Sequence, residues 1–212
     1  MQNMPPPSVE FWFDFGSTYS YPAAMRIERL AAQAGARLAW RPFLLGPIFS
    51  QQGWNTSPFN IYLAKGRYMW RDLERICAAA GIPFKKPTVF PRNGLLAARI
   101  GCHFADAPWI PAFVRAVFAA NFASDLDISD AEVIARLLSS VGQPADAIIE
   151  QAQTVQSKDR LRQQSNEAVQ LGIFGAPSMR VGDELFWGND RLEDAFDWYR
   201  RQAELNIISR LG

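Results

Sequence analysis

The serine at position 17 has the surroundings that best suit chemistry. It follows Phe11–Phe15, an aromatic run of strand length, after a glycine that interrupts the run. Apolar and small residues then recur at helical spacing over Tyr21–Ala34. Ser17 is therefore expected where a strand ends and a helix begins, and the N–H groups and dipole of such a junction favour an anion such as a thiolate or carboxylate. The alternative is that Ser17 or Thr18 only caps the helix.

Few other residues offer catalytic or metal-binding chemistry. The chain has one histidine, His103, and two cysteines, Cys77 and Cys102, far apart in sequence. Without C-x-x-C or H-x-x-x-H spacing, no metal site is predicted. His103 lies in a predicted helix and is expected to be a packing or surface residue rather than the base of a Ser-His-Asp triad. The cysteines are expected to be buried thiols in a reducing compartment, with a disulfide as the alternative.

Composition excludes several classes of protein. Hydrophobic residues make up 49% of the 212 positions, which excludes a disordered chain. The net charge of +1, from 22 basic and 21 acidic residues, gives no electrostatic case for nucleic acid or an anionic membrane as a partner. No apolar run approaches the roughly 20 residues that span a bilayer. Met1–Pro7 lacks the features of a secretory signal, so we expect a flexible tail over residues 1–8 and a cytoplasmic location.

The elements that must position Ser17 follow from the patterning along the chain. Arg37–Phe43 alternates like a strand, which predicts a right-handed β-α-β unit. Leu44–Asn60 is polar and is predicted to be a long loop. Later helices are predicted over Ile61–Gly81, Asn93–Ala105, Trp109–Phe122, Ser129–Val141, Pro144–Gln153 and Thr154–Leu171. A hairpin of strands at 175–181 and 184–187 is then followed by a helix over Leu192–Leu205, capped by Asn189 or Asp190.

This order resembles the thioredoxin fold with a helical insertion. Ser17 and Ser20 stand where redox members of that fold carry C-x-x-C, so dithiol chemistry is not expected. Phe174–Ser178 resembles the segment that holds the cis-proline of the fold, here Pro177, and Trp187–Leu192 reads Trp-Gly-Asn-Asp-Arg-Leu. Together these segments resemble the 2-hydroxychromene-2-carboxylate isomerase family, whose relatives are the kappa-class glutathione transferases and, more distantly, the oxidoreductase DsbA.

The resemblance implies an α/β fold with two parts. Residues 9–46 and 172–212 would form a thioredoxin-like domain, and residues 47–171 an all-helical insertion. The resemblance also implies a homodimer.

The resemblance further implies glutathione as the cofactor. Ser17 would face its sulfur, and the backbone at Ala176, next to Pro177, would pair with its peptide. Asp190 would hold its ammonium group and Lys65 its glycyl carboxylate. The residues that the resemblance places at glutathione are Ser17, Asn55, Lys65, Ala176, Pro177, Gly188, Asn189, Asp190 and Arg191. Those that would face the substrate are Tyr19, Ser50, Phe90 and Asn93.

Each of these residues also has a plain structural interpretation. Asp190 would cap the last helix, and Arg191 would form a surface ion pair. Lys65 would be solvated, Asn55 would belong to a turn, and Tyr19 would be a core residue.

The implied reaction begins with a thiolate. A free thiol has a pKa near about 8.5, and a hydrogen bond from Ser17 together with the helix dipole would stabilise the anion. The thiolate would add to a conjugated aromatic carboxylate such as a 2-hydroxychromene-2-carboxylate, a bond would rotate, and elimination would return glutathione unchanged.

Two departures bear on the substrate. Thr18 stands where the family often has proline, and Ser50 lies where some members carry a lysine, with no lysine between Arg41 and Lys65. The alternative functions are a kappa-type glutathione transferase or peroxidase, and a non-catalytic module that binds thiol peptides.

Overall fold

A mixed sheet forms the centre of the described chain. The structure, a computed structural model, describes residues 8–211. Within that range the sheet has four strands in the order β2-β1-β3-β4. The central strand β1 (Ser8–Phe13) is parallel to β2 (Arg37–Pro42) and antiparallel to β3 (Ser178–Val181), which forms a hairpin with β4 (Glu184–Trp187). The predicted β-α-β unit and the late hairpin are both confirmed.

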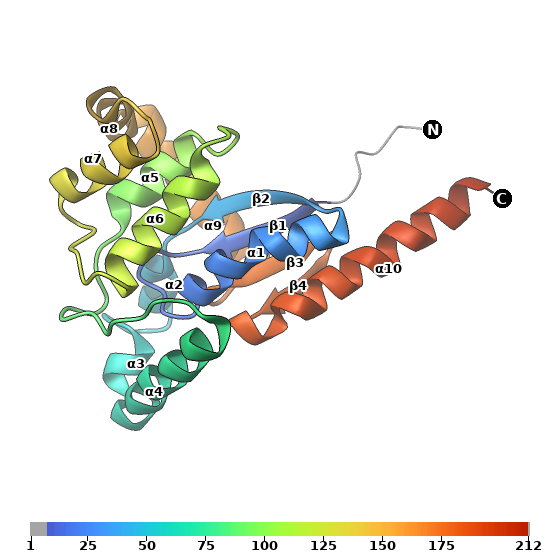
Figure 1. Cartoon of the computed structure of the whole chain (residues 1–212), viewed down its shortest axis with the longest axis horizontal. Coiled ribbons are helices and arrows are strands. Elements are labelled where there is room, and N and C mark those ends of the chain that lie inside the picture. The colour runs from blue at the N-terminus through green and yellow to red at the C-terminus, as the bar shows by residue number, and fades with distance from the viewer. Residues whose placement is uncertain (1–7, 212) are drawn as a thin grey trace.

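The side chains of β1 alternate between two hydrophobic cores. Phe11 and Phe13 belong to the main core, which includes residues of α1 (Ser20–Ala34) and the first turns of α10 (Leu192–Leu211). Trp12 points to the other face and joins a smaller cluster with Phe43, Ile48, Ala168 and Ile173. Helices α1 and α10 pack against each other beside the sheet (Figure 1). Because successive strand residues face opposite sides, β1 is buried on both faces.

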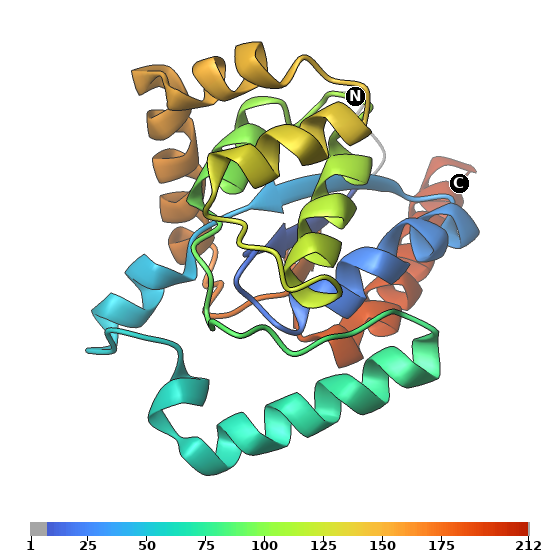
Figure 2. The ribbon, with the colours of Figure 1, turned by 60° about the vertical axis from the view of Figure 1, so that its left-hand side comes forward.

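The remaining long helices lie between the second and third strands. The group α5–α8 packs together at one end of the sheet, while α4 stands apart from it in both Figure 1 and Figure 2. The helices are α4 (Leu63–Ala80), α5 (Leu95–His103), α6 (Ile110–Phe122), α7 (Ala131–Ser140), α8 (Ala145–Gln153) and α9 (Val155–Gln170). The helices predicted in this region are confirmed, with ends that shift by a few residues.

The predicted long loop over Leu44–Asn60 is wrong, because it contains two short helices. Helix α2 spans Leu45–Gln51, and its first N–H group is bound by the distant carboxylate of Asp14. Helix α3 spans Pro58–Ile61 and is capped by Ser57, whose hydroxyl accepts the N–H of Phe59. The predicted boundary after residue 46 therefore cuts through α2, and the division into two domains stays a prediction.

Both ends of the chain also differ from expectation. Ser8 begins β1 and does not belong to a tail, while residues 1–7 lie outside the described residues. The last helix continues to Leu211, beyond the predicted end at Leu205.

The two cysteines and the histidine have structural rather than catalytic surroundings. Cys77 and Cys102 are both free and buried, so the alternative of a disulfide is wrong. His103 ends α5, with its ring centroid 4.7 Å from that of Phe104. It is a packing residue, as expected.

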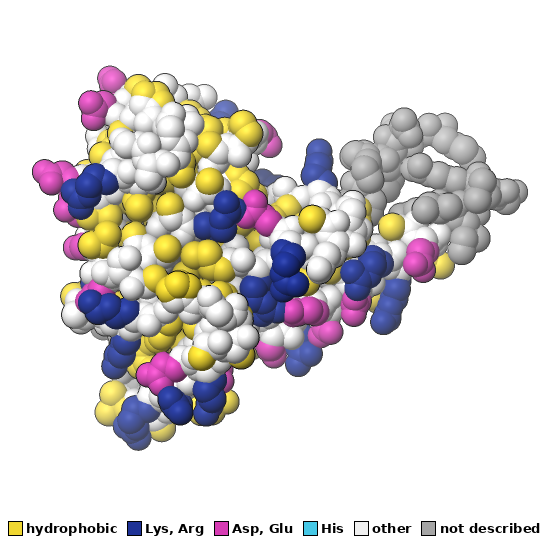
Figure 3. Space-filling view, in the orientation of Figure 1, with side chains coloured by type: hydrophobic (Ala, Val, Ile, Leu, Met, Phe, Trp, Pro, Cys, Tyr) yellow, Lys and Arg dark blue, Asp and Glu magenta, His cyan; other side chains and the backbone are white. Residues whose placement is uncertain are grey.

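One face of the molecule shows how its charged side chains are distributed. On the face seen in Figure 3, acidic and basic side chains are interspersed over the helices. Among residues 8–211, no helix combines the length and the apolar character that crossing a membrane requires.

Candidate active site

A large cleft opens where β1 ends and α1 begins. Its volume is about 1510 Å³. It is lined by the turn before α1, by α2 and α3, by the segment that leads into α5, and by the chain on either side of the β3–β4 hairpin. Every site residue predicted from the sequence lines this one cleft: Ser17, Tyr19, Ser50, Asn55, Lys65, Phe90, Asn93, Ala176, Pro177, Gly188, Asn189, Asp190 and Arg191.

Ser17 joins two segments that are far apart in sequence. Its hydroxyl donates to the carbonyl oxygen of Ala176 at 2.9 Å and accepts the N–H of Ser20, the first residue of α1, at 3.3 Å. Ser17 thus binds the start of the helix and also lines the cleft, where it is 8% exposed. Thr18 does not cap the helix, because its hydroxyl donates to the sulfur of Met69.

The segment around Pro177 forms the wall opposite Ser17. The Ala176–Pro177 peptide bond is cis, as predicted, and the Phe90–Pro91 bond is cis as well. A Cβ atom on Gly175 would lie 2.4 Å from Nε1 of Trp187, so the indole packs directly on the backbone of this wall. A side chain at position 175 would therefore force the indole or the wall to shift.

The turn after β4 is also shaped by a glycine. Gly188 has φ 115° and donates its N–H to the carbonyl oxygen of Pro177 at 2.9 Å. The next residues form a 3₁₀ turn, η1 (Asn189–Arg191), that leads into α10. Neither Asn189 nor Asp190 makes the predicted helix cap. The Asn189 side chain is buried and accepts a hydrogen bond from Arg26 of α1 at 3.3 Å, while the Asp190 side chain is 74% exposed.

The charged groups at the mouth of the cleft are exposed. Arg191 pairs with Asp194 at 2.9 Å and with Asp190 at 3.5 Å, and these partners raise its pKa, Asp194 most. It is thus a surface ion pair as well as a lining residue. Lys65 is exposed, with Nζ 4.9 Å from the ring centroid of Tyr62, and Asn55 is a further exposed residue of the lining.

Comparison with known proteins gives a consistent relationship over nearly the whole chain. The family model for the DSBA-like thioredoxin domain matches residues 8–199. The 2-hydroxychromene-2-carboxylate isomerase of Sphingobium xenophagum is 32% identical over 187 residues, which cover 88% of this chain and 94% of the relative. A solved structure of 2-hydroxychromene-2-carboxylate isomerase superposes with a TM-score of 0.82 at 29% identity, covering 96% of this chain and 98% of that one.

The chain belongs to the 2-hydroxychromene-2-carboxylate isomerase family. The thioredoxin-like fold predicted from the sequence is confirmed by the same matches. A glutathione S-transferase kappa 1 of Caenorhabditis elegans is a further relative, 25% identical over 199 residues, covering 87% of each chain. The relatives thus support an enzyme of the isomerase or glutathione transferase kind.

In this family member Tyr19 connects α1 to α4. Its hydroxyl donates to Oδ2 of Asp72 at 3.0 Å, and its ring lies 6.3 Å from that of Phe59. Burial, and then the neighbouring Asp72 carboxylate, raise the pKa of Tyr19 well above its usual range. The hydroxyl therefore stays protonated at neutral pH, and Tyr19 is not a core residue but a half-buried one at the cleft.

The other residues predicted on the substrate side have structural contacts of their own. Oδ1 of Asn93 accepts the N–H of Leu95 at the start of α5. The ring of Phe90 packs edge-on against Trp70 at 4.9 Å. Ser50 is exposed on α2, and its connection to the site is that it lines the cleft.

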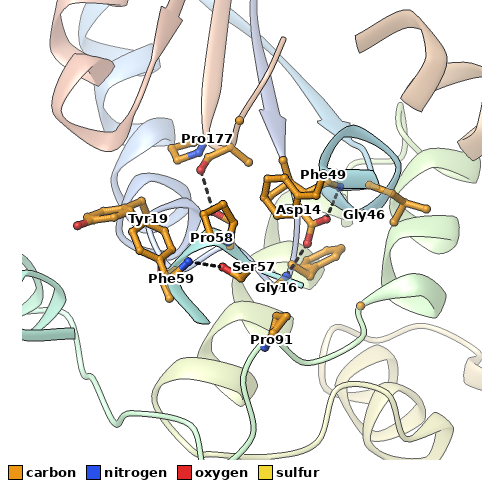
Figure 4. A pocket seen from close by; sticks show the side chains of 18 of the residues that line it. Asp14, Gly16, Tyr19, Gly46, Phe49, Ser57, Pro58, Phe59, Pro91 and Pro177 are labelled. Carbon is orange, nitrogen blue, oxygen red and sulfur yellow. Dashed lines mark hydrogen bonds between the residues drawn. The ribbon is translucent and has the colours of Figure 1, made fainter. Parts of the chain in front are cut away.

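Besides Asp72, the partner of Tyr19, two charged residues of the lining were missed by the sequence analysis. Asp14 accepts the N–H of Gly16 at 2.7 Å and that of Leu45 at 2.8 Å (Figure 4). Burial raises the pKa of Asp14, and these two hydrogen bonds oppose the rise. The Asp-x-Gly spacing, typical of an Asx turn, was the signal that could have revealed this residue.

Arg92 is the second missed residue. It is buried and pairs with Asp125, and Nη1 also donates to Oδ1 of Asn121 at 3.2 Å. Asn121 in turn donates to the carbonyl oxygen of Phe15 at 3.1 Å. The network holds the turn before Ser17 in place. No local sequence signal indicates it, because the bonded partners are 29, 33 and 106 residues apart.

Proposed function

We propose that the protein is a glutathione-dependent isomerase of a small aromatic or conjugated substrate that resembles a 2-hydroxychromene-2-carboxylate. The observation that carries the proposal is the Ser17 hydroxyl, which lies in the cleft against the backbone of Ala176 in a member of this isomerase family. The kinship to a kappa-class glutathione transferase supports glutathione as the cofactor.

The donor set in the cleft suits glutathione. The Ser17 hydroxyl can rotate, so its proton can turn from the Ala176 carbonyl to a thiolate. The carbonyl oxygen would then be left to accept an N–H of the tripeptide, as in strand addition. Lys65 and Asp190, both exposed at the mouth, would meet a carboxylate and the ammonium group.

The size of the cleft supports two ligands together. Sites for single small molecules measure about 300–1,000 Å³, and this cleft holds about 1510 Å³. The lining combines Ser17, Ala176 and Asp190 with the rings of Phe43, Phe49 and Phe90, which we propose as an apolar half of the cleft. The apolar half would take the aromatic substrate and keep water from the reacting atoms.

Glutathione, when bound, would supply a thiolate that adds reversibly to a conjugated carbon and leaves unchanged. Ser17 would favour that anion by donating a hydrogen bond, aided by the N-terminus of α1. Tyr19 would stay neutral at pH 7, as an ordinary tyrosine does, with its hydroxyl proton donated to Asp72. None of these residues serves as a general base for Ser17, which argues for a hydrogen-bonding rather than a nucleophilic serine.

The decisive experiment removes the Ser17 hydroxyl. Ser17→Ala is expected to lower kcat about 100-fold with conserved glutathione affinity, because one donor to the reacting anion is lost. Isomerisation is followed spectroscopically and affinity by isothermal titration. Ser20→Ala is the matched control, since the buried Ser20 hydroxyl has no hydrogen-bond partner and does not line the cleft. Undiminished turnover in Ser17→Ala would reject the role given to this serine.

Two alternatives are separated by simple measurements. A kappa-type transferase or peroxidase, favoured by the kappa-class relative, would consume glutathione, whereas an isomerase returns all of it. A non-catalytic thiol-peptide module would bind glutathione without turning over any conjugated substrate.

A further inference from the structure

Asp14 is a charged group in the cleft that the proposed reaction does not use. It lies at the end of β1, and Figure 4 shows its carboxylate beside Phe49 and Gly46 of α2, on the other side of Gly16 from Tyr19 and Phe59. By solvent exposure Asp14 is half-buried, and it lines the cleft. The lining also includes the apolar residues Phe43, Leu45, Pro47, Phe49, Phe90 and Leu95, together with the polar Ser50 and Asn93.

The two hydrogen bonds of Asp14 fix its carboxylate without saturating it. Oδ1 accepts the N–H of Gly16, and Oδ2 accepts that of Leu45. A carboxylate has about four acceptor positions, so about two are left. Gly16 keeps this space open, because a Cβ atom there would lie 3.2 Å from Oδ1.

Asp14 also lacks a cationic partner within the described residues. None of the ion pairs found there includes it. The nearby guanidinium of Arg92 is directed to Asp125 and Asn121. A half-buried acceptor with spare lone pairs in an apolar wall is costly unless a donor reaches it.

We propose that Asp14 binds a hydroxyl group on the ring of the aromatic substrate. The inference rests on the proposed function, because it takes the apolar half of the cleft as the place of that ring. A neutral hydroxyl is the fitting donor, since it satisfies the carboxylate and brings no charge into the apolar wall. A carboxylate on the same substrate would then point away from Asp14, because the two groups carry like charge.

The test compares two neutral probes that differ by one O-methylation, which removes the donor and adds a methyl group. Umbelliferone carries a ring hydroxyl, and herniarin is its O-methyl ether. Each is titrated by isothermal calorimetry and fluorescence at mildly acidic pH, with and without glutathione. We expect the intact protein to bind umbelliferone about tenfold or more tightly than herniarin, as a hydrogen bond to a charged group allows.

Two variants test whether the preference for umbelliferone depends on the carboxylate of Asp14. Asp14→Asn is expected to reduce the preference to about onefold, because the amide keeps the shape but places a donor where an acceptor was. Asp72→Asn is the matched control, since Asp72 also lines the cleft but is hydrogen-bonded to Tyr19. It should leave the preference intact.

Several outcomes would overturn the proposal. Equal affinity of the intact protein for the two probes would do so, as would an Asp14→Asn variant that binds both probes more weakly by the same factor. If Asp14→Asn does not fold, the control decides: a preference that survives in Asp72→Asn supports the proposal, and one that vanishes there refutes it. Glutathione titration keeps the proposals distinct, because a protein that prefers umbelliferone but binds no glutathione contradicts the proposed function alone.

Discussion

At the scale of single residues, Ser17 unites the two interpretations that its sequence position allows. Its hydroxyl accepts the first N–H of α1, as a cap does, and it also donates across the cleft to Ala176. A sequence pattern cannot reveal the hydrogen bond to Ala176, because Ala176 lies 159 positions from Ser17. Ser17 therefore bonds to the start of α1 and, in the proposed function, also lies beside the bound thiolate.

The cysteines lead to a prediction at the same scale. Burial raises the pKa of Cys77 and of Cys102 to about 11, so at pH 7 only about one thiol in ten thousand is ionised. We expect the native protein to react with iodoacetamide far more slowly than free glutathione does, and to react fully in urea. Alkylation followed by mass spectrometry measures both rates. Rapid native labelling of either cysteine would contradict this and would offer a thiol other than that of glutathione.

At the scale of elements, periodicity identified what packs against the core and missed what is held by distant groups. Helix α1 and the strands were predicted because their apolar spacing reflects burial. Helix α2 was missed because its first N–H is bound by Asp14, which belongs to another element. Asn189 was expected to cap α10, but Arg26 of α1 takes its side-chain oxygen. Helix α3 had a readable signal, a serine cap followed by Pro58, and should have been found.

The predicted site residues met in one cleft for a related reason. The resemblance supplied segments that the fold brings together, whereas composition and spacing alone gave only Ser17. Neither the resemblance nor the spacing of residues indicated Asp14 or Arg92. Asp14 had been counted as part of a strand, and Arg92 acts through Asn121 and Asp125.

The glycine under Trp187 gives a prediction for an element. Gly175→Ala would place a Cβ atom 2.4 Å from the indole nitrogen, so the wall before Pro177 must move. We expect a loss of about 1–3 kcal/mol in the free energy of unfolding, measured by urea denaturation, together with weaker glutathione binding. Gly46→Ala is the control, because nothing lies within 4 Å of a Cβ atom there. Equal stability of the two variants would show that the indole yields freely.

At the scale of the whole molecule, a buried network links the helical region to the sheet. Asp125 pairs with Arg92, which contacts Asn121, and Asn121 binds the backbone of Phe15 next to the turn that carries Ser17. The arrangement of α5 and α6 therefore bears directly on the cleft. The sequence did not indicate this link, because Arg92 and Asp125 lie in separate loops, before α5 and after α6, and show no spacing relationship.

Acid should weaken this network first. Hydrogen bonds from the Thr88 backbone and then from Arg92 lower the pKa of Asp125 to about 2, below its ordinary 3.8. Because the folded-state pKa is the lower one, the stabilisation is complete above about pH 4 and is lost as the pH falls toward about 2. Asp125→Asn should reduce the fall in the free energy of unfolding at acid pH (the acid limb), measured by urea denaturation at a series of pH values. Asparagine tolerates the φ of 57° at this position.

The control for this prediction is Asp183→Asn, which changes a fully exposed carboxylate on the β3–β4 turn. It should leave the acid limb unchanged. An acid limb of the same slope in Asp125→Asn and in the intact protein would show that other carboxylates govern acid unfolding.

The place of β1 in the sheet also affects how the chain is made. This strand is made well before its partner β3, which begins only at Ser178. Until β3 is made, the nascent chain carries a bare apolar strand edge, and the turn with Ser17 has no opposing wall. Ribosome-bound intermediates that stop short of Pro177 would therefore be inactive and prone to self-association, and the cleft closes only after this segment has been made.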